Sequence, residues 1–246
     1  MHIYSKFSQF SADIYTPIEL YLSLRHHYRK TCLLESNDYH SRKDSKSFIG
    51  CDPIVELTLT NLILTITTTH KVVEKKLVST ESFAEQIQKI LDTFSFSDTK
   101  FNGFFGRIGF EFTLKDETHI EKTSTDSDIP DLHLFVYKYI IVIDHFTSDG
   151  FLIENSLSFL KEATNIEDLF RKNTSIQLPF ETLGEEESDF SEIEFLNIIE
   201  KGINHCKRGD VFQLVLSNEF RQHFFGDDFL GYYRLCSQPL PCPQSK

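Results

Sequence analysis

The feature that most constrains the fold is residues 134–146, which read LFVYKYIIVIDHF. Apolar side chains occupy most positions on both faces of an extended chain, and this pattern is typical of a strand buried on both sides. Such a strand lies inside the protein core. Residues 101–114 form a second long apolar segment, so we expect the middle of the chain to be rich in β-structure.

Three short motifs predict where helices begin. Thr16, Ser82 and Ser191 each precede a glutamate by three residues, which is the spacing of a capping box. Pro17 suits a first helical turn, and this first helix should run through about Tyr28. The second helix has an apolar face made of Phe83, Ile87, Ile90, Leu91 and Phe94. The third ends at a C-cap, Gly209, and has an inner face made of Leu196, Ile199, Ile203 and Cys206.

Strands are expected between these helices. Residues 31–35, 47–59, 62–67 and 151–153 have the composition and alternation of strands, and Asn61 and residues 147–150 suit turns. The sequence shows no repeat of fixed period. The pattern predicts an α+β fold with mostly antiparallel sheets and packed helices.

Composition excludes several classes of protein. The chain has 246 residues and a formal net charge of −12, whereas a nucleic-acid-binding surface needs clustered basic residues. No apolar run reaches the ~18 residues of a transmembrane helix, and the N-terminus is too polar for a signal peptide. The scattered cysteines suit reduced thiols, and they are Cys32, Cys51, Cys206, Cys236 and Cys242. These features predict a cytoplasmic protein without nucleic-acid or membrane partners.

The chain divides into regions of different composition. Residues 181–192, ETLGEEESDFSE, are acidic and weakly apolar, and we interpret them as a connector between residues 1–180 and a second region that begins at residue 193. Residues 236–246, CSQPLPCPQSK, contain three of the seven prolines and show no helix or strand pattern. We interpret them as an aberrant tail.

Residues 211–217, VFQLVLS, carry the main chemical signal in a chain that lacks the generic catalytic motifs. As a strand, this segment places Phe212, Leu214 and Leu216 on a core face. Gln213 and Ser217 lie on the other face, where a buried strand normally carries only hydrocarbon. Gln213 therefore has either a function or a solvent-exposed edge position.

Two further features have simple interpretations. Gly103, Gly106 and Gly109 recur every three residues and match no nucleotide-binding motif, so we interpret them as small residues that let a bent strand pass close to other backbone. The pairs at residues 26–27 and 205–206 contain histidine and cysteine, but neighbouring residues on a helix point in different directions and chelate a metal poorly.

Four phrases, taken in order, resemble a known enzyme family. They read TPIELYLSLR, CLLESNDYHSRKDSKSFIGCDP, FNGFFGRIGFEF and HCKRGDVFQLVLSNEF, the last followed by GDDFLGYYR. From about Thr16 to Arg234 the chain resembles component I of anthranilate synthase, a chorismate-utilising enzyme. The resemblance implies a component I-like fold whose chorismate-binding domain starts at residues 193–235 and is incomplete at the C-terminus.

The resemblance also implies an activity. The family converts chorismate to anthranilate and pyruvate in tryptophan biosynthesis, with ammonia from a glutamine amidotransferase subunit and Mg²⁺ on the substrate carboxylate. Relatives that add water to chorismate have a lysine base at the position of Gln213. Ammonia needs no such base, so the resemblance implies that Gln213 orients the nucleophile, with Ser217 as a weaker candidate.

The phrase LLES resembles the tryptophan feedback pocket of component I. The matching residues are Leu34, Glu35, Ser36 and Lys46. A hydroxyl and a carboxylate suit the ammonium group of L-tryptophan, and a lysine suits its carboxylate. The competing interpretation is that Ser36 only forms a turn. Aminodeoxychorismate synthase component I shares the GDxxQ phrase and is a second alternative, but LLES with Lys46 favours anthranilate synthase.

The chain departs from the family in two places. Asn218 and Glu219 stand where basic residues are usual. After Arg234 the family's Asn-Pro-Ser-Pro-Tyr phrase does not follow, and the magnesium ligands, the acid–base groups and the rest of the tryptophan pocket are expected beyond it. This predicts that the chain alone is inactive. The alternative function is a non-catalytic module that binds tryptophan or the amidotransferase subunit.

Overall fold

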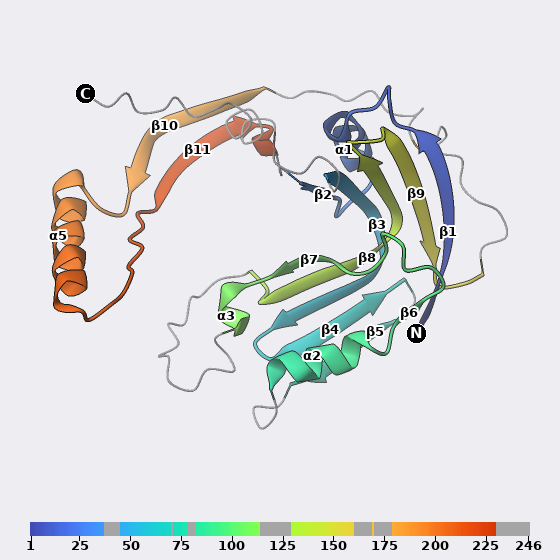
Figure 1. Cartoon of the computed structure of the whole chain (residues 1–246), viewed down its shortest axis with the longest axis horizontal. Helices are drawn as coiled ribbons and strands as arrows, with labels where there is room; N and C mark the ends of the chain where they lie inside the picture. Colours follow the sequence, from blue (N-terminus) through green and yellow to red (C-terminus); the bar gives the residue numbers. More distant parts are fainter. Residues whose placement is uncertain are drawn as a thin grey trace. The chain divides into compact units, whose positions relative to one another are not determined.

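The computed structural model describes residues 1–36, 45–69, 71–77, 82–113, 129–159, 169 and 179–229. The chain divides into two compact units, Met1–Ser175 and Ile176–Lys246. The fold is α+β with mostly antiparallel strands, as predicted (Figure 1). In the described residues no helix combines the length and the apolar character needed to cross a bilayer.

The first unit is built on one nine-stranded sheet. The strand order is β5-β4-β3-β8-β9-β1-β6, with β2 also paired to β3 and β7 to β8. Among the described strands of this sheet the β1–β6 pair is parallel and the other pairs are antiparallel. The strands are β1 (His2–Ser11), β2 (Cys32–Glu35), β3 (Lys46–Thr60), β4 (Ile63–Thr68), β5 (Val72–Lys76), β6 (Ser95–Phe96), β7 (Phe105–Ile108), β8 (Leu132–Asp144) and β9 (Asp149–Ser156).

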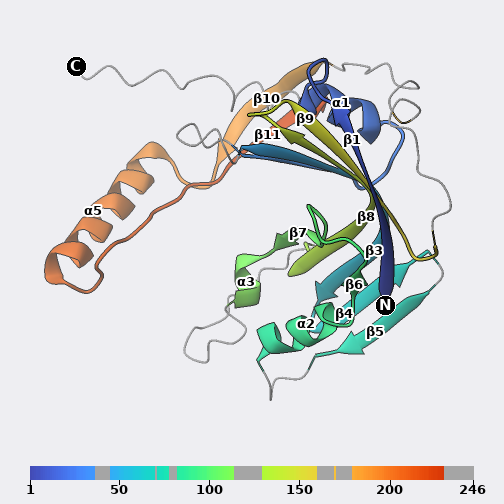
Figure 2. The ribbon, with the colours of Figure 1, turned by 45° about the vertical axis from the view of Figure 1, so that its right-hand side comes forward.

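The centre of this sheet is the strand predicted from residues 134–146. It forms β8, which pairs with β3 on one side and β9 on the other. Helix α1 (Pro17–Arg25) lies against one face of the sheet (Figure 2). Ile141 and Leu152 pack there with Leu20 and Leu24 of this helix. Ile140 and other side chains pack on the opposite face. The prediction of burial on both faces is confirmed.

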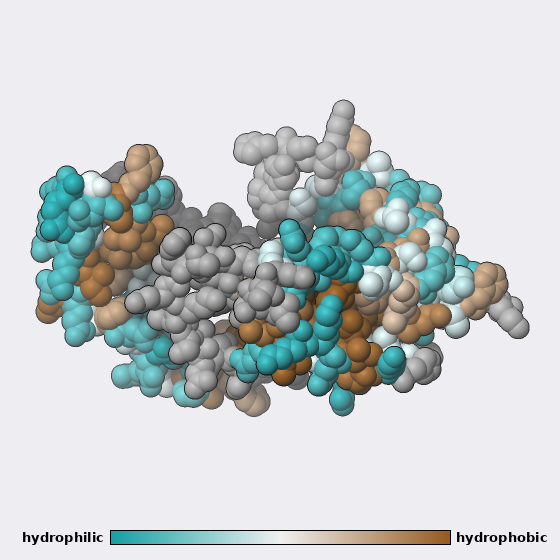
Figure 3. All heavy atoms as spheres, turned by 90° about the horizontal axis from the view of Figure 1, so that it is seen from below, coloured by the Kyte–Doolittle hydropathy of each residue, from teal (hydrophilic) through white to brown (hydrophobic). Residues whose placement is uncertain are grey.

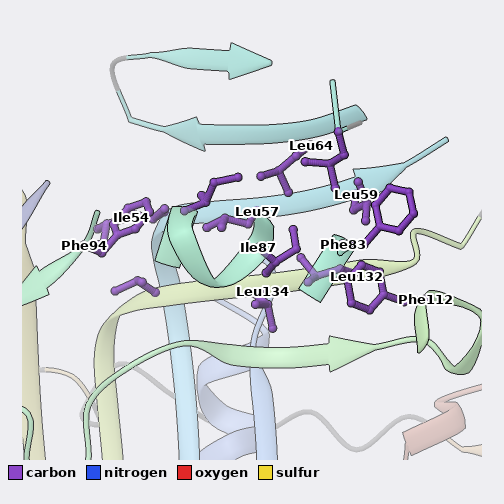
Figure 4. Close-up of a cluster of buried hydrophobic side chains, with 14 of the residues drawn as sticks. Ile54, Leu57, Leu59, Leu64, Phe83, Ile87, Phe94, Phe112, Leu132 and Leu134 are labelled. Atoms are coloured by element: carbon purple, nitrogen blue, oxygen red, sulfur yellow. The ribbon is translucent and has the colours of Figure 1, made fainter. Parts of the chain in front are cut away.

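The predicted helix starts in this unit are confirmed. Thr16 Oγ1 accepts a hydrogen bond from Glu19 N at 3.2 Å, and Ser82 Oγ accepts one from Glu85 N at 3.4 Å. Helix α1 ends at Arg25, before the predicted Tyr28. Helix α2 (Phe83–Leu91) packs on the sheet through its predicted apolar face. This face forms a cluster of buried side chains with residues of β3, β4 and β8 (Figure 4). A short helix, α3 (Phe110–Thr113), follows β7.

The second unit consists of a two-stranded ribbon and a helix. Strand β10 (Phe180–Ser188) pairs with β11 (Phe220–Gly226), and α5 (Glu192–Arg208) lies between them in the sequence. Ser191 and Glu194 form a complete capping box, and Gly209 ends α5 in the left-handed conformation with φ 83°. These two predictions are confirmed.

Residues 181–192, which we interpret as a connector, overlap β10 and the start of α5. Residues 180–188 form β10, because β11 supplies backbone hydrogen-bond partners that the local sequence does not reveal. The boundary between the two units lies earlier, at residues 175/176. The division of the chain at residues 181–192 stays a prediction.

The prediction of a strand at residues 211–217 is wrong. This segment is extended but pairs with no strand among the described residues. Its predicted core face is only partly covered: a methyl group added at Gly202 of α5 would lie 3.0 Å from Leu214 and 3.2 Å from Leu216, whereas Phe212 is fully exposed. A strand needs a hydrogen-bonded neighbour, and the described part of this unit offers none to this segment.

The inner face predicted for α5 is largely open. Leu196 is 54% exposed and Ile203 is 46% exposed, and the buried residue of this helix is Gly202. The apolar residues of α5 do recur at helical spacing, but the described residues offer little surface for them to pack against. Apolar side chains are visible at the molecular surface (Figure 3).

Candidate functional site

The residues predicted to bind tryptophan meet at one end of β2 and β3. The antiparallel pair aligns Leu34 with Phe48 and Glu35 with Ser47. Beyond the last pair, Ser36 N donates a hydrogen bond to Lys46 O at 3.3 Å. Strand pairing therefore brings together four residues that are separated in the sequence by the loop at 37–44, which lies outside the described residues.

The strand register places these residues on two faces of the sheet. Successive side chains of a strand point to opposite faces. Leu34 and Lys46 therefore share one face, and Ser36 continues in register with them. Glu35 belongs to the other face, beside Ser47. Of the four predicted residues, Leu34, Ser36 and Lys46 therefore lie on one face of the sheet and Glu35 lies on the opposite face.

Lys46 forms an ion pair across the sheet. Its Nζ lies 3.2 Å from Oδ2 of Asp144, the residue opposite it at the end of β8. Oδ1 of Asp144 accepts hydrogen bonds from the backbone amides of Phe146 at 2.9 Å and Thr147 at 3.2 Å. Burial by itself raises the pKa of Asp144, but the two amides and Lys46 outweigh it, so the pKa lies below its usual value. Asp144 is a fixed carboxylate at neutral pH.

A second polar group lies on the opposite face. The Ser47 hydroxyl donates to Glu35 Oε1 at 3.4 Å and lies 2.7 Å from Nε2 of His145. Ser47 is fully buried, whereas Glu35 and His145 are exposed. This arrangement fixes the direction of the Glu35 carboxylate by a hydrogen bond from inside the sheet.

The side chains of Ser36, Lys46 and Asp144 together suit a zwitterion. Ser36 is exposed, and its hydroxyl has no hydrogen-bond partner among the described residues. Lys46 is 20% exposed and its charge is matched by Asp144. An α-amino acid placed at this ion pair would present its carboxylate to Lys46 and its ammonium to Asp144. The side chains therefore have the chemistry of an amino-acid site.

Three contributors to this site were not identified from the sequence as site residues. Asp144 accepts hydrogen bonds from the amides of Phe146 and Thr147 in the turn after β8, and its pairing with Lys46 was not foreseen. Ser47 and His145 were missed entirely. The available signal was the polar Asp-His pair that interrupts the apolar run of β8 at its end.

Gln213 lies in the second unit and is described there by itself. It is exposed, on the extended segment without strand pairing, and so is Ser217. Its role as a nucleophile-orienting residue stays a prediction.

Asn218 and Glu219, which depart from the family pattern, have structural partners in the second unit. Asn218 Nδ2 donates to Ser188 Oγ at 2.8 Å, and Glu219 Oε1 accepts from Arg221 Nε at 2.9 Å. Arg221 also contacts Asp189 Oδ1 at 2.7 Å. These bonds fasten the end of the extended segment to the β10–β11 ribbon.

The described residues do not form a magnesium site of the kind that the resemblance implies. Among the described residues, no three His, Cys, Asp or Glu side chains lie close enough to hold a metal ion. We therefore derive no catalytic step through magnesium. The thiols of Cys32, Cys51 and Cys206 are free within this part of the chain.

Comparison with known proteins identifies the family. The family described as chorismate binding enzymes matches residues 29–243. The chain belongs to this family. Anthranilate synthase component 1 of Lactococcus lactis is 25% identical over 248 residues, covering 93% of this chain and 51% of that protein. The Bacillus subtilis protein of the same name is 24% identical and covers 95% and 50%.

A solved structure agrees with this chorismate-binding family assignment. The crystal structure of anthranilate synthase component I from Streptococcus pneumoniae matches with a TM-score of 0.54 and 19% identity, over 92% of this chain and 51% of that one. At this identity the match establishes the fold alone. The chain spans about half the length of the bacterial relatives it matches.

Proposed function

We propose that this chain carries the N-terminal part of an anthranilate synthase component I. The whole enzyme would convert chorismate and ammonia to anthranilate and pyruvate, with the ammonia delivered by a glutamine amidotransferase subunit in the cytoplasm. The names of the matched relatives and the family of the chain support this proposal. The observation that carries it is the Lys46–Asp144 ion pair beside the open hydroxyl of Ser36.

The amino-acid site would bind L-tryptophan as a feedback inhibitor. Lys46 would take its carboxylate and Asp144 its ammonium, and the Ser36 hydroxyl would add a hydrogen bond. Phe48, on the same face as Lys46, offers an aromatic surface next to them. This interpretation uses Leu34, Ser36 and Lys46 directly and leaves Glu35 as a supporting residue.

The chemistry needs more residues than this part of the chain offers. Elimination of pyruvate requires a placed metal, an acid–base group and an oriented nucleophile that act together. Gln213 would supply only the orientation of ammonia. Magnesium would be held by residues outside those described, so we expect the chain alone to form no anthranilate.

A complementation assay tests the activity. The chain is mixed with the remaining half of the Lactococcus lactis relative, then supplied with chorismate, Mg²⁺ and ammonium, and anthranilate is followed by its fluorescence. We expect no product from the chain alone, product from the mixture, and a loss of most of it in Gln213→Ala. Turnover by the chain alone that Gln213→Ala abolishes would overturn the expectation of inactivity.

The same assay separates the alternatives. If chorismate is consumed without anthranilate and an aminated chorismate accumulates, the chain belongs with aminodeoxychorismate synthase. If no mixture consumes chorismate but the chain binds the amidotransferase subunit or tryptophan, it is a non-catalytic module.

Calorimetry tests the tryptophan site. One wall of the site is present among the described residues, so we expect affinity weaker than micromolar for the chain alone and a further loss of about tenfold in Ser36→Ala. Ser8→Ala on β1 is the matched control and should change nothing. Micromolar binding that Ser36→Ala abolishes would instead favour a self-sufficient regulatory module.

A further inference from the structure

A strongly basic turn follows α1 in this acidic protein. Residues 25–31 read RHHYRKT and contain no acidic residue, although the chain as a whole has a net charge of −12. Together with Tyr21 they line a depression of about 490 Å³. That volume is within the range of sites for small metabolites.

The backbone gathers these side chains at a chain reversal. Helix α1 ends at Arg25, and the amides of His27 and Tyr28 both donate to Leu24 O, at 3.0 and 2.9 Å. Lys30 then adopts a left-handed conformation with φ 56°, which turns the chain into β2. The basic groups therefore cluster in one place instead of spreading along a helix.

The base of the depression is held in place by contacts with the sheet. Lys30 pairs with Glu56 of β3, and Glu56 also lies 2.8 Å from Nε2 of His133 on β8. The Tyr28 ring packs edge-on against Tyr139, with ring centroids 6.0 Å apart. Burial is the main cause that raises the pKa of Tyr28, so its hydroxyl stays protonated and can donate to an anion.

Within the described residues, the positive charge of this turn is neutralised at Lys30 but not at His27 or Arg29. The nearby acidic groups have cations of their own, since Glu56 pairs with Lys30 and Asp52 lies 3.7 Å from Lys138. Among the described residues, His27 and Arg29 have no ion-pair partner, and both are exposed. The helix dipole favours a cation at Arg25 but does not account for basic residues beyond the helix end.

A second basic depression on α5 differs in this respect. A space of about 480 Å³ is lined by Lys201, Asn204, His205, Lys207 and Arg208. There Asp210 Oδ2 lies 3.0 Å from Arg208 and 2.8 Å from Nδ1 of His205, so a carboxylate of the protein already pairs with two of the basic side chains. This region is the internal control for the first.

We propose that the depression at residues 25–31 binds a small anion that carries several phosphate or carboxylate groups. The Arg29 guanidinium can hold one such group in a bidentate manner, and His27 and the Tyr28 hydroxyl can donate to others. The site lies outside the predicted tryptophan site and does not depend on the proposed function.

Calorimetric titration with tripolyphosphate and with citrate tests this site. We expect one site per chain, weaker binding at higher ionic strength, and a loss of about ten- to a hundredfold in the double variant His27→Gln/Arg29→Gln. The control Lys207→Gln/Arg208→Gln should bind as the unaltered chain does. The tighter of the two probes shows whether phosphate or carboxylate is preferred. Binding of neither probe, or equal loss in both variants, would overturn the proposal.

A second measurement needs no variant. Amide chemical shifts of the unaltered full chain are recorded during titration with tripolyphosphate. We expect the changes to concentrate at residues 21–31. Changes centred on residues 201–208, or spread over all basic residues, would show nonspecific attraction and refute the proposed site.

Discussion

Gly106 allows β7 to lie against β8 at a point where no side chain fits. It stands opposite Leu134, and a Cβ atom added to it would lie 2.0 Å from the backbone oxygen of His133. Its φ of 151° also disfavours other residues. The interpretation of the glycines as residues that permit a close backbone approach is confirmed for Gly106 but not for Gly103, where nothing lies within 4 Å of an added Cβ.

This contact predicts a steric effect at a single residue. Gly106→Ala should lower the free energy of unfolding by about 3 kcal/mol, because strain and displaced backbone add together. Gly103→Ala is the control, since Gly103 has a similar φ of 154° but nothing within 4 Å of an added Cβ. It should cost about 1 kcal/mol or less. Urea denaturation measures both, and equal losses would contradict the steric explanation.

The Asp144 carboxylate predicts a pH dependence. Asp144→Asn keeps an oxygen for the amides of Phe146 and Thr147 but removes the charge that pairs with Lys46. The folded-state pKa of Asp144 is lowered, so its stabilisation is present above the unfolded pKa near ~4 and disappears as pH falls through the folded value. At neutral pH we expect the variant to be less stable by about 1 kcal/mol.

Unfolding curves at several pH values check this prediction. The difference in unfolding free energy between the unaltered chain and Asp144→Asn should disappear in acid. Asp149→Asn serves as the matched control, because its carboxylate accepts a hydrogen bond from Gln9 but forms no ion pair with the described residues. A difference in unfolding free energy that stays constant down to acid pH would show that the ion pair contributes nothing to stability.

At the scale of elements, the extended segment 211–219 behaves unlike the strands of the first unit. Apart from Glu219, whose carbonyl accepts a hydrogen bond from the amide of Asp189, its backbone groups pair with no strand in the described part of the chain, whereas β8 is paired on both sides. Amides without such bonds exchange with solvent quickly. We expect hydrogen exchange to be complete within seconds at residues 211–219 and slow at β8, measured on the same sample.

The ribbon of β10 and β11 is the internal control for this measurement. Its amides are paired but exposed, so they should exchange at intermediate rates. Protection at residues 211–219 equal to that of β8 would mean that the segment pairs with a strand after all. It would also restore the strand predicted for residues 211–217.

At the scale of the molecule, the second unit leaves much apolar surface uncovered. Phe212 is fully exposed, Val215 is 82% exposed, and Ile193 is 74% exposed. Exposed apolar side chains promote association when they lie close together. We expect the purified chain to bind a hydrophobic dye and to self-associate as its concentration rises, by light scattering.

Two substitutions locate the effect. Phe212→Ser/Val215→Ser should reduce dye binding clearly, because it removes two of the most exposed apolar side chains of the second unit. Ile14→Ser is the control. Ile14 is also highly exposed, at 78%, but it belongs to the first unit. A chain that stays monomeric and binds no dye would refute this account.

The sequence by itself determined the features that depend on nearby residues. The helix starts at Thr16, Ser82 and Ser191 follow from a side chain and an amide three residues apart, which bind each other in almost any fold. The dense apolar run of β8 needs only burial, and the four family phrases are patterns of residues in order. These predictions were correct because their causes are local or compositional.

Only the tertiary structure decided the features that depend on distant partners. The polar residues of β1 form a strand because β9 and β6 pair with it, and β10 forms because β11 lies beside it. Residues 211–217 alternate like a strand yet lack a described partner. Lys46 meets Asp144 only because β3 and β8 pair in register. Strand pairing joins groups far apart in the sequence, so no local pattern can specify which groups meet.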